Sequence, residues 1–386
     1  MENLKRVDLI FGAYTNEKYK VLESSMSKSS EEIINEMIAS GLKGRGGAGF
    51  LTGMKWKFTA AEKDPVKYVV CNADEGEPGT FKDREILTVV PRKVFSGMAI
   101  CGKAIGAKKG YMYLRGEYRY MLPDLMKELE IYHEHARRFG HDFTIEIRMG
   151  SGAYICGEES ALFESIEGKR GEPRNKPPYP TVAGLFSKPT VINNVETFVN
   201  AVMIMKYGAN EFKKLGTSDS RGSKMFSVSG DTPKAGIHEL ELGMSLADFV
   251  NEFGDGDTKA VQVGGASGFC VPRKRFNDTI IGFEGVPTGG SMMLFNSSRS
   301  MYNVLHNYLD FFEEESCGQC TPCRIGCQQL LKGIVAVKKG EKPSSYLDQL
   351  LKLSDTMKIT AKCGLGQSVA NSFASIVENF KEEMIY

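Results

Sequence analysis

The sequence lacks a long hydrophobic run, and no apolar stretch approaches the roughly 20 residues that a membrane-spanning helix needs. It also lacks an excess of one charge, because 49 lysines and arginines face 48 aspartates and glutamates, a net charge of +1. That balance gives no reason to expect nucleic acid or an anionic membrane surface as a partner. The first residues, MENLKRVDLIF, lack the apolar core of a signal peptide. We therefore expect a cytoplasmic protein that does not insert into a membrane.

Cysteine and glycine are the residue types that stand out. The chain has nine cysteines, and in a reducing cytoplasm these are expected to be metal ligands or buried free thiols rather than disulfides. The 42 glycines gather in particular loops, which indicates either backbone held close to a ligand or a mobile loop. A length of 386 residues allows two or three domains.

The first half of the chain alternates helical and strand-like segments. A helix is predicted at 29–41, where Ser29 and Glu32 have the spacing of a capping box. Strands are predicted at 68–71, 108–118 and 143–150, and further helices at 91–106 and 121–139. Strands alternating with helices predict an open α/β sheet up to about residue 214.

Two changes of pattern predict two further domains. The polar stretch 214–224, rich in glycine and serine, is typical of a linker. Short strands around one helix at 245–253 then predict a small α+β module that ends near residue 300. From Met301 onward, four helical segments predict a small bundle.

Four cysteines lie close together in ESCGQCTPCRIGC (315–327). Cys317, Cys320 and Cys323 have the C-x2-C-x2-C spacing that wraps a loop around three corners of a [4Fe–4S] cluster. Structural zinc is the alternative, but it prefers two C-x2–4-C pairs or a pair of histidines. The spacing therefore favours an iron–sulfur cluster.

The fourth ligand has two candidates. Cys327 completes C-x2-C-x2-C-x3-C, but in bacterial ferredoxins that cysteine serves a second cluster and precedes a proline, whereas Gln328 follows here. Cys363, in TAKCGLGQ, lies beside a glycine that lets the backbone approach closely. We predict Cys363 as the ligand and Cys327 as a small buried residue. The same buried role is expected of the other four cysteines, Cys71, Cys101, Cys156 and Cys270.

The loop GRGGAG (44–49) satisfies the pattern G-x-G-x-x-G. A helix is predicted before it, however, and not the strand that precedes a dinucleotide-binding fingerprint. Arg45 and Lys55 bring positive charge to this glycine-lined backbone, which suits phosphate. Nearby aromatic residues offer flat surfaces for a heteroaromatic ring; they are Phe50, Trp56 and Phe58. The loop is a candidate nucleotide contact.

Three polar loops extend this pattern. NADEGEPG (72–79) follows a strand, which is where ligands gather in open α/β sheets. YICGEES (154–160) places two adjacent carboxylates after a glycine, and PTVINNVET (189–197) carries two adjacent amides. Each has an ordinary alternative, because acidic turns are often only solvated and amides often cap a helix. Their combination with a cluster is more informative, since converting paired into single electrons usually requires a flavin.

Six motifs in this order resemble the flavoprotein (51-kDa-type, NADH-binding) subunit of NADH:quinone oxidoreductase. The same family occurs in NAD-linked multimeric hydrogenases and formate dehydrogenases. The motifs are GRGGAGF-x-TG-x-KW, CNADEGEPGTFKDR, GAYICGEE-[ST]-AL, GEPR-x-KPP, NNVET and SCG-x-C-x-PCR. The resemblance implies an α/β Rossmann-like FMN- and NADH-binding domain (1–214), a small β-grasp module (224–300) and a C-terminal helical bundle carrying the [4Fe–4S] cluster (301–386).

The resemblance also implies the site residues. FMN would lie against Gly44, Arg45, Gly46, Gly47, Lys55, Asn72, Asp74, Glu75, Tyr154, Gly157, Glu158, Val191, Asn193, Asn194 and Thr197. NAD(H) would bind over the flavin through Phe50, Phe58, Glu77, Glu159, Lys176 and Tyr179. The cluster ligands would be Cys317, Cys320, Cys323 and Cys363. Glu159 is the candidate catalytic residue, because a carboxylate beside flavin and nicotinamide can alter reduction potential and product release.

Three departures from the family pattern are Leu51, where proline is usual, Tyr179, where phenylalanine is common, and Cys327. Compared with many hydrogenase relatives, we expect no N-terminal ferredoxin-type extension and no C-terminal ferredoxin domain, and therefore a single cluster.

The implied activity is hydride transfer from NADH to FMN, followed by release of single electrons to the cluster and on to clusters of partner subunits. The expected partners are a thioredoxin-like [2Fe–2S] subunit and a larger iron–sulfur subunit. A hydrogenase-type complex, with or without electron bifurcation, is favoured over respiratory complex I and formate dehydrogenase. The alternative of another class is a non-catalytic electron-wire subunit.

Overall fold

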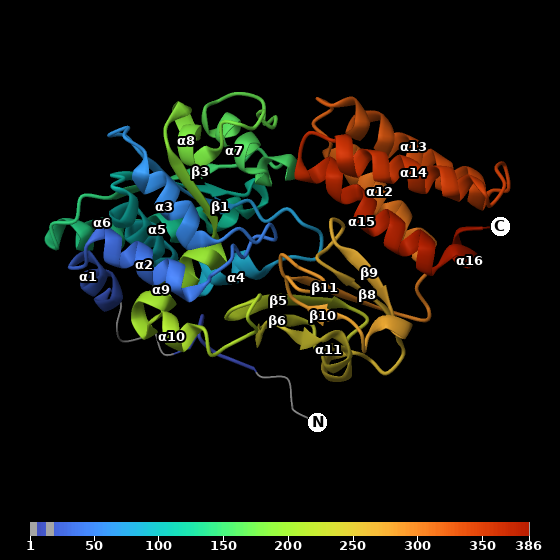
Figure 1. Ribbon diagram of the computed structural model, residues 1–386, viewed down its shortest axis with the longest axis horizontal. Coiled ribbons are helices and arrows are strands. Elements are labelled where there is room, and N and C mark those ends of the chain that lie inside the picture. The colour runs from blue at the N-terminus through green and yellow to red at the C-terminus, as the bar shows by residue number, and fades with distance from the viewer. Residues whose placement is uncertain (1–5, 13–18, 386) are drawn as a thin grey trace.

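The computed structural model describes residues 6–12 and 19–385. Three parts follow one another along the chain (Figure 1). We call them the α/β part (19–212), the middle part (223–296) and the helical part (301–385). In Figure 1 the α/β part lies on the left, the middle part at the lower right and the helical part at the upper right.

The α/β part is built on a four-stranded sheet in which every neighbouring pair is parallel, in the order β3-β2-β1-β4. The strands are β1 (Tyr68–Ala73), β2 (Lys109–Leu114), β3 (Thr144–Met149) and β4 (Thr190–Asn194). The α-helices are α1 (Lys20–Met26), α2 (Ser30–Ser40), α3 (Thr52–Ala61), α4 (Lys82–Val89), α5 (Pro91–Ile105), α6 (Leu122–Arg138), α7 (Glu159–Ile166), α8 (Pro180–Ala183), α9 (Val195–Tyr207) and α10 (Ala209–Phe212). Three short 3-10 helices are η1 (Gly116–Met121), η2 (Tyr154–Gly157) and η3 (Leu185–Ser187).

Both faces of this sheet are buried. Along β1, Val69 and Cys71 pack in the hydrophobic cluster that contains side chains of α5 and α9. Val70, between them, packs in the cluster that contains side chains of α7. This alternation follows from the two-residue period of a strand, and burial on both faces is typical of parallel sheets.

Local sequence signals explain where several helices begin and end. Ser29 and Glu32 form the predicted capping box at the start of α2, and Gly41 ends that helix with a left-handed backbone, φ 66°. The predicted strand at 108–118 is too long, however. β2 ends at Leu114, because the amide of Tyr118 donates to the carbonyl of Arg115 and the chain turns into η1.

The middle part is a five-stranded sheet in the order β6-β5-β11-β8-β9. Only the β11–β5 pair is parallel. Its elements are β5 (Ser223–Gly230), β6 (Gly236–Glu241), β7 (Met244–Ser245), α11 (Leu246–Phe253), β8 (Thr258–Val263), β9 (Phe269–Pro272), η4 (Arg273–Arg275), β10 (Ile280–Ile281) and β11 (Ser291–Asn296). Phe249 and Phe253 of α11 are buried against this sheet in a core of their own.

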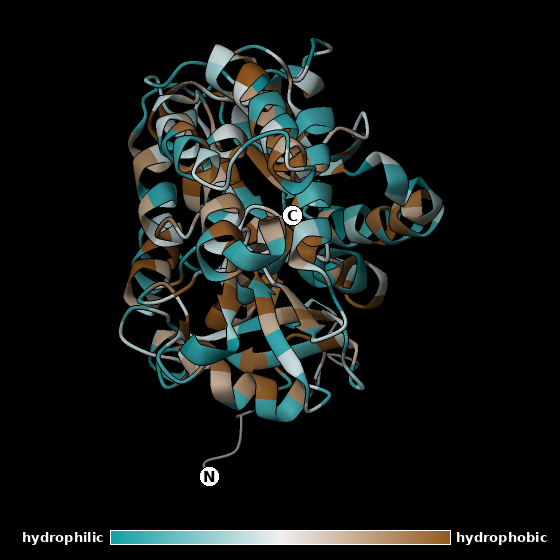
Figure 2. Cartoon of the chain, turned by 90° about the vertical axis from the view of Figure 1, so that its right-hand side faces the viewer, coloured by the Kyte–Doolittle hydropathy of each residue, from teal (hydrophilic) through white to brown (hydrophobic). Residues whose placement is uncertain are grey.

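The helical part packs four long helices around a shared core. They are α12 (Met301–Glu315), α13 (Thr321–Lys338), α14 (Tyr346–Thr360) and α15 (Gly364–Asn379), followed by the short α16 (Lys381–Met384). The sequence predicts one helix at the end of the chain. The structure has two helices there, α15 and α16, with Phe380 between them. In Figure 2 the helices carry both hydrophobic and hydrophilic segments, as expected of helices that bury one face.

The prediction of a mixed α/β fold with a parallel sheet and a helical C-terminal region is confirmed. None of the helices within 6–12 and 19–385 combines the length and the apolar character that crossing a bilayer would require.

Candidate functional site

The predicted flavin loops meet at the carboxyl edge of the parallel sheet. β1 and β4 are neighbours, and Asn72 lies opposite Asn194 in their register. Because parallel strands end at the same edge, the loops that follow them open onto a common space. A cavity of about 460 Å³ lies there.

Ten of the predicted residues line this cavity. They are Gly46, Gly47, Asn72, Asp74, Glu75, Glu77, Tyr154, Gly157, Glu158 and Asn194. The rest of the wall includes Ser267 and Gly289 of the middle part and Leu365 and Asn371 of the helical part. All three parts of the chain therefore build one cavity.

The glycine loop brings bare backbone to the cavity. The amide of Gly44 donates to the carbonyl of Phe50 (2.9 Å), which closes the loop. A Cβ atom on Gly46 would lie 3.2 Å from Cβ of Asn194, and Gly47 has a φ of 110° that other residues rarely adopt. Side chains at these positions would fill the space that a ligand needs.

Two buried polar atoms on the cavity wall have no hydrogen-bond partner among the described residues. They are Oδ2 of Asp74 and Oγ1 of Thr80. Burial raises the pKa of Asp74 to about 7, although the Arg115 guanidinium partly opposes this. Asn72 beside it donates from Nδ2 to the carbonyl of Gly157 (2.8 Å). Free acceptors next to a glycine cradle fit a ligand with several hydroxyl groups, such as the ribityl chain of FMN.

A cluster of buried charges lies beside the cavity. Lys82 Nζ is 2.6 Å from Asp83 Oδ1 and 3.1 Å from Glu196 Oε2. Lys224 Nζ, from the middle part, is 3.0 Å from the same Glu196 oxygen, and the charged side chains of all three pairs are at most 3% exposed. Lys82 and Asp83 line the cavity, but the sequence analysis did not name them. They lie in FKDR, the end of a motif that it quoted, so the signal was present.

Several predicted flavin residues lie behind the wall rather than on it. The Arg45 guanidinium donates to the carbonyl of Arg221 (2.5 Å), and the Arg45 amide donates to Thr197 Oγ1 (2.9 Å). Burial lowers the pKa of Arg45 to about 10. Lys55 donates to the carbonyl of Ile192 (2.9 Å). This placement makes them supports of the glycine loop and of β4.

Asn193 and Val191 are supports of the same kind. Asn193 Oδ1 accepts from Trp56 Nε1 (2.9 Å), and Val191 is buried in the core. Glu75 reaches the cavity, but its carboxylate accepts from the amides of Asp83 (2.7 Å) and Arg84 (3.1 Å) at the start of α4. Burial and the neighbouring Asp83 raise the pKa of Glu75. Asn194 caps α9. Helix capping was one of the two roles that the sequence suggested for the adjacent amides.

The predicted NAD(H) residues divide into two groups. Phe50, Phe58 and Tyr179 are exposed, with 51%, 46% and 59% of their surface accessible. They lie outside the cavity lining, on the loop before α3, on α3 itself and just before α8. Exposed aromatic side chains suit the stacking of a nucleotide base.

The second group is charged. Lys176 Nζ is 2.9 Å from Glu158 Oε1 and 2.6 Å from Glu159 Oε1. Burial opposes the charge of Lys176, but the two glutamates outweigh it and raise its pKa. Glu158 also caps α7, accepting from the amides of Ser160 and Ala161. This bridge ties the proline-rich loop to α7.

Glu77 is half-buried at the junction of the three parts. It accepts from the Tyr154 hydroxyl (2.5 Å) and from the amide of Ser267 (3.0 Å). Burial raises its pKa. The amide of Tyr154 donates to Glu315 Oε2 (2.8 Å), and its ring packs against Phe311 at 5.0 Å between centroids. Tyr154 therefore contacts all three parts.

The four predicted cluster ligands line a second, smaller pocket. Cys317 and Cys320 lie in the loop before α13, Cys323 in its first turn, and Cys363 immediately before α15. Cys323 and Cys363 are brought together because Gly366 lets α15 approach α13; a Cβ atom on Gly366 would lie 3.0 Å from Cβ of Cys323. Burial raises the pKa of Cys363 to about 11.

The remaining cysteines are placed as expected of buried residues. Cys327 lies within α13, is fully buried and does not line the pocket. Cys71, Cys101, Cys156 and Cys270 are also buried. Within the part of the chain that the structure describes, no three His, Cys, Asp or Glu side chains are grouped as ligands of a single metal ion. Four thiols around one pocket fit the corners of a cubane.

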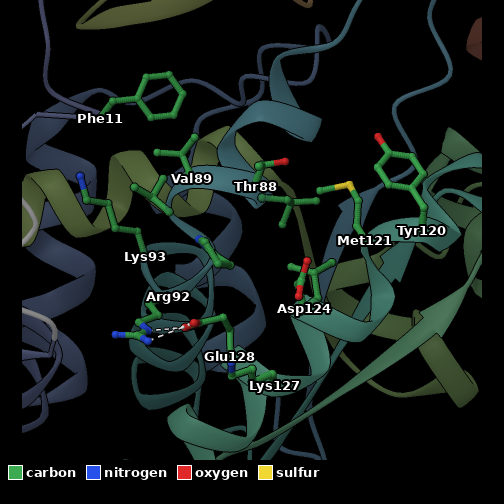
Figure 3. Close-up of a pocket in the computed structure, with 14 residues that line it drawn as sticks. Phe11, Thr88, Val89, Arg92, Lys93, Tyr120, Met121, Asp124, Lys127 and Glu128 are labelled. Atoms are coloured by element: carbon green, nitrogen blue, oxygen red, sulfur yellow. Dashed lines mark hydrogen bonds and ion pairs between the residues drawn. The ribbon is translucent and has the colours of Figure 1, made fainter.

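A groove of about 560 Å³ lies elsewhere in the α/β part, where the loop between α4 and α5 faces α6 (Figure 3). Phe11, Val89, Tyr120 and Met121 supply apolar surface, and the Arg92 guanidinium pairs with Glu128. None of the predicted site residues lines this groove. We therefore assign the candidate site to the cavity and the cysteine pocket.

Two known families match the chain. The Nuo51 FMN-binding domain matches residues 37–203, and the NADH-ubiquinone oxidoreductase-F iron–sulfur binding region matches residues 303–386. The first match contains most of the cavity residues and the second contains all four cysteines of the pocket.

Curated relatives match along most of the chain. NAD-reducing hydrogenase HoxS subunit alpha of Cupriavidus necator is 43% identical over 94% of this chain and 61% of its own length. NADP-reducing hydrogenase subunit HndC of Solidesulfovibrio fructosivorans is 40% identical over 95% of this chain and 78% of its own. The F-type subunit of the NADH-quinone oxidoreductase of Aquifex aeolicus is 39% identical over 95% and 88%.

A solved structure has the same fold. The crystal structure of an NAD+-reducing [NiFe]-hydrogenase in the H2-reduced state matches with a TM-score of 0.91 and 39% identity. The match covers 98% of this chain and 66% of the solved chain. The chain thus spans less than two thirds of that protein and of the HoxS relative.

Proposed function

The chain belongs to the family of FMN-binding, iron–sulfur subunits of NADH-quinone oxidoreductases and their hydrogenase relatives, and from this membership we propose that it is the NAD(H)-oxidising subunit of a multisubunit oxidoreductase. The observation that carries the proposal is the pairing of two sites. A cavity that fits a flavin and a pocket that fits a [4Fe–4S] cluster share two wall residues, Ile155 and Leu365.

The residues of the cavity suit FMN. Gly46 and Gly47 would hold it with backbone, and Asn72 and Asp74 would bind its hydroxyl groups. Arg45, Lys55, Asn193 and Thr197 would act through the backbone that they support. When bound, FMN takes two electrons as hydride and releases them singly, which a [4Fe–4S] cluster held by Cys317, Cys320, Cys323 and Cys363 can carry onward.

The exposed aromatic residues and the Glu158–Lys176–Glu159 bridge would bind NAD(H). Phe50, Phe58 and Tyr179 would stack on its bases, and Glu77 would close the inner end of its site. Orienting the nicotinamide is the contribution that the protein makes to hydride transfer.

We also propose the finer architecture and the setting. Residues 1–214 would form a Rossmann-like domain, 224–300 a β-grasp domain and 301–386 the cluster-bearing bundle. The partners would be a thioredoxin-like [2Fe–2S] subunit and a larger iron–sulfur subunit in a cytoplasmic, hydrogenase-type complex. The names of the HoxS and HndC relatives and the hydrogenase structure support that type over complex I.

The test of the proposed function is a diaphorase assay on the isolated chain purified without oxygen. We expect a yellow protein that reduces ferricyanide with NADH. A colourless chain without this activity, but with an intact cluster, would instead support a non-catalytic electron-wire subunit.

Glu159→Gln tests the candidate catalytic residue. Removing the charge breaks one half of the bridge to Lys176, so we expect NADH kinetics to change several-fold while flavin and iron content stay the same. Glu164→Gln is the matched control, because Glu164 lies on the same helix as Glu159 and is also paired, with Arg174 (2.5 Å), but takes no part in the bridge to Lys176. Equal kinetics in both variants and in the unaltered chain would remove Glu159 from the site.

A further inference from the structure

Two side chains, Ile155 and Leu365, line both the cavity and the cysteine pocket. Each is only 6% exposed, and both belong to the hydrophobic cluster that also contains Cys323. These two apolar side chains therefore form part of the wall between the cavity and Cys323. Cys363 is placed differently, because it lines an open pocket together with Glu158 and Gly364 of the cavity wall.

The backbone positions of both residues are fixed. Ile155 follows Tyr154, whose amide is bonded to Glu315 at the end of α12, next to the cysteine loop. Leu365 lies in the first turn of α15, two residues after Cys363. That turn is held by Gln367, whose amide donates to the carbonyl of Cys363 (3.2 Å) and whose Nε2 donates to the carbonyl of Ala361 (2.9 Å).

The spaces on the two sides differ in polarity. The cavity wall includes the carboxylates of Asp74, Glu75, Glu77 and Glu158. The cysteine pocket is lined by thiols and by Ile155, Pro173 and Leu365 among others. An apolar shell controls the access of water to a metal centre, and water exposure is one of the factors that set the potential of an iron–sulfur cluster.

We propose that Ile155 and Leu365 form a dry partition that separates the polar flavin cavity from the buried ligand Cys323 and keeps water of the cavity away from its thiol. This inference rests on the proposed function, because it assigns the two sides to the two cofactors. It makes Ile155 and Leu365 positioning residues, which act on the surroundings of the cluster rather than on the substrate.

The test compares Leu365→Ala and Ile155→Ala with Leu330→Ala in the chain loaded with FMN and cluster. Leu330 is fully buried in α13, belongs to the same hydrophobic cluster and lines neither space, so it controls for lost packing. Two properties are measured. One is the midpoint potential of the cluster in an EPR-monitored titration, and the other is the rate at which an iron chelator bleaches the cluster.

We expect both partition variants to raise the potential, because water stabilises the more negatively charged reduced cluster. The iron chelator should bleach the cluster about tenfold faster, because loss of the groups that surround a metal site weakens metal binding by about that factor or more. Leu330→Ala should leave both properties unchanged, and Leu365→Met, which restores the volume, should return them toward the original values. If an alanine variant does not fold, Leu365→Val should show a smaller shift in the same direction.

Partition variants that match the unaltered chain in potential and in bleaching would overturn the inference. That result differs from failure of the proposed function, in which the unaltered chain itself would bind no flavin or no cluster.

Discussion

The cavity and the cysteine pocket adjoin each other, but they are assembled in different ways. The pocket takes three of its cysteines from one seven-residue stretch of sequence, and the fourth from the turn before α15 of the same helical part. The cavity takes its wall from all three parts, and the buried charges beside it are paired across the chain, as Lys224 is with Glu196. A locally built site should tolerate disturbance elsewhere, whereas a site built over long distances should depend on contacts between the parts.

The largest expected effect concerns the local site. Cys363→Ala should abolish the [4Fe–4S] cluster and leave FMN bound, because the thiol is one of four corners of the pocket. Cys327→Ala is the matched control and should keep its iron, since Cys327 lies outside that pocket. Iron and sulfide analysis of both purified variants makes the measurement. A cluster that survives in Cys363→Ala but is lost in Cys327→Ala would reverse the assignment.

The next effect concerns the contacts that join the parts around the cavity. Lys224→Met removes one partner of a fully buried ion pair and should cost about 3 kcal/mol or more of unfolding free energy. Lys108→Met is the control, since the Lys108–Asp142 pair is 81% and 76% exposed and should be worth less than about 1 kcal/mol. Urea unfolding compares the two. Similar losses in both variants would show that the buried ion pairs do not hold the parts together around the cavity.

A smaller effect is expected at the junction of the three parts. Tyr154→Phe removes hydrogen bonds to Glu77 and to Ser267 (2.7 Å) and should cost about 1–3 kcal/mol, because the half-buried Glu77 carboxylate is left with fewer donors. Tyr308→Phe is matched to it, since the Tyr308 hydroxyl is buried without a hydrogen-bond partner among the described residues. That variant should unfold at the same urea concentration or slightly higher. If the two variants unfold at the same urea concentration, the Tyr154 hydroxyl does not stabilise the contact between the parts.

The smallest effect is a pH dependence inside the cavity. Asp74 has a pKa of about 7 in the structure and faces Arg115, Glu117 and Glu315. When ionised, its unpartnered Oδ2 would accept a hydrogen bond from a hydroxyl group of FMN, so FMN should bind less tightly as the pH falls below 7, by up to about tenfold per pH unit. Asp74→Asn should lack this step. The phosphate of FMN titrates equally with both proteins, so the difference between the two affinity profiles isolates Asp74, and parallel profiles would place Asp74 outside the FMN contacts.

The same contrast explains what could be predicted from sequence. The cysteine triplet, the capping box of α2 and the strands β1, β2 and β3 are local patterns, and reasoning from local patterns found them. The fourth strand of that sheet, β4, was missed, because the sequence analysis assigned 189–197 to a polar loop. Lys82 and Asp83 escaped notice because their role depends on partners more than 100 residues away, such as Glu196. Ser267 and Asn371 belong to other parts of the chain, and only the tertiary fold brings them to the cavity.

The fold also directs the side chains of some predicted site residues differently from what the sequence suggested. Arg45 was expected to bring its charge toward phosphate, but it is buried with its guanidinium bonded to the carbonyl of Arg221. Sequence patterns identify a charged residue beside a glycine loop but not the direction of its side chain. The shared wall of Ile155 and Leu365 has no sequence signature, since each is an ordinary hydrophobic residue next to a motif.

The most direct test of the account is cofactor analysis of the chain after anaerobic reconstitution with FMN, iron and sulfide. The account predicts one FMN and one [4Fe–4S] cluster for each chain, with the cluster reduced when NADH is added. A chain that bound zinc in place of iron and sulfide, and retained no flavin, would contradict it.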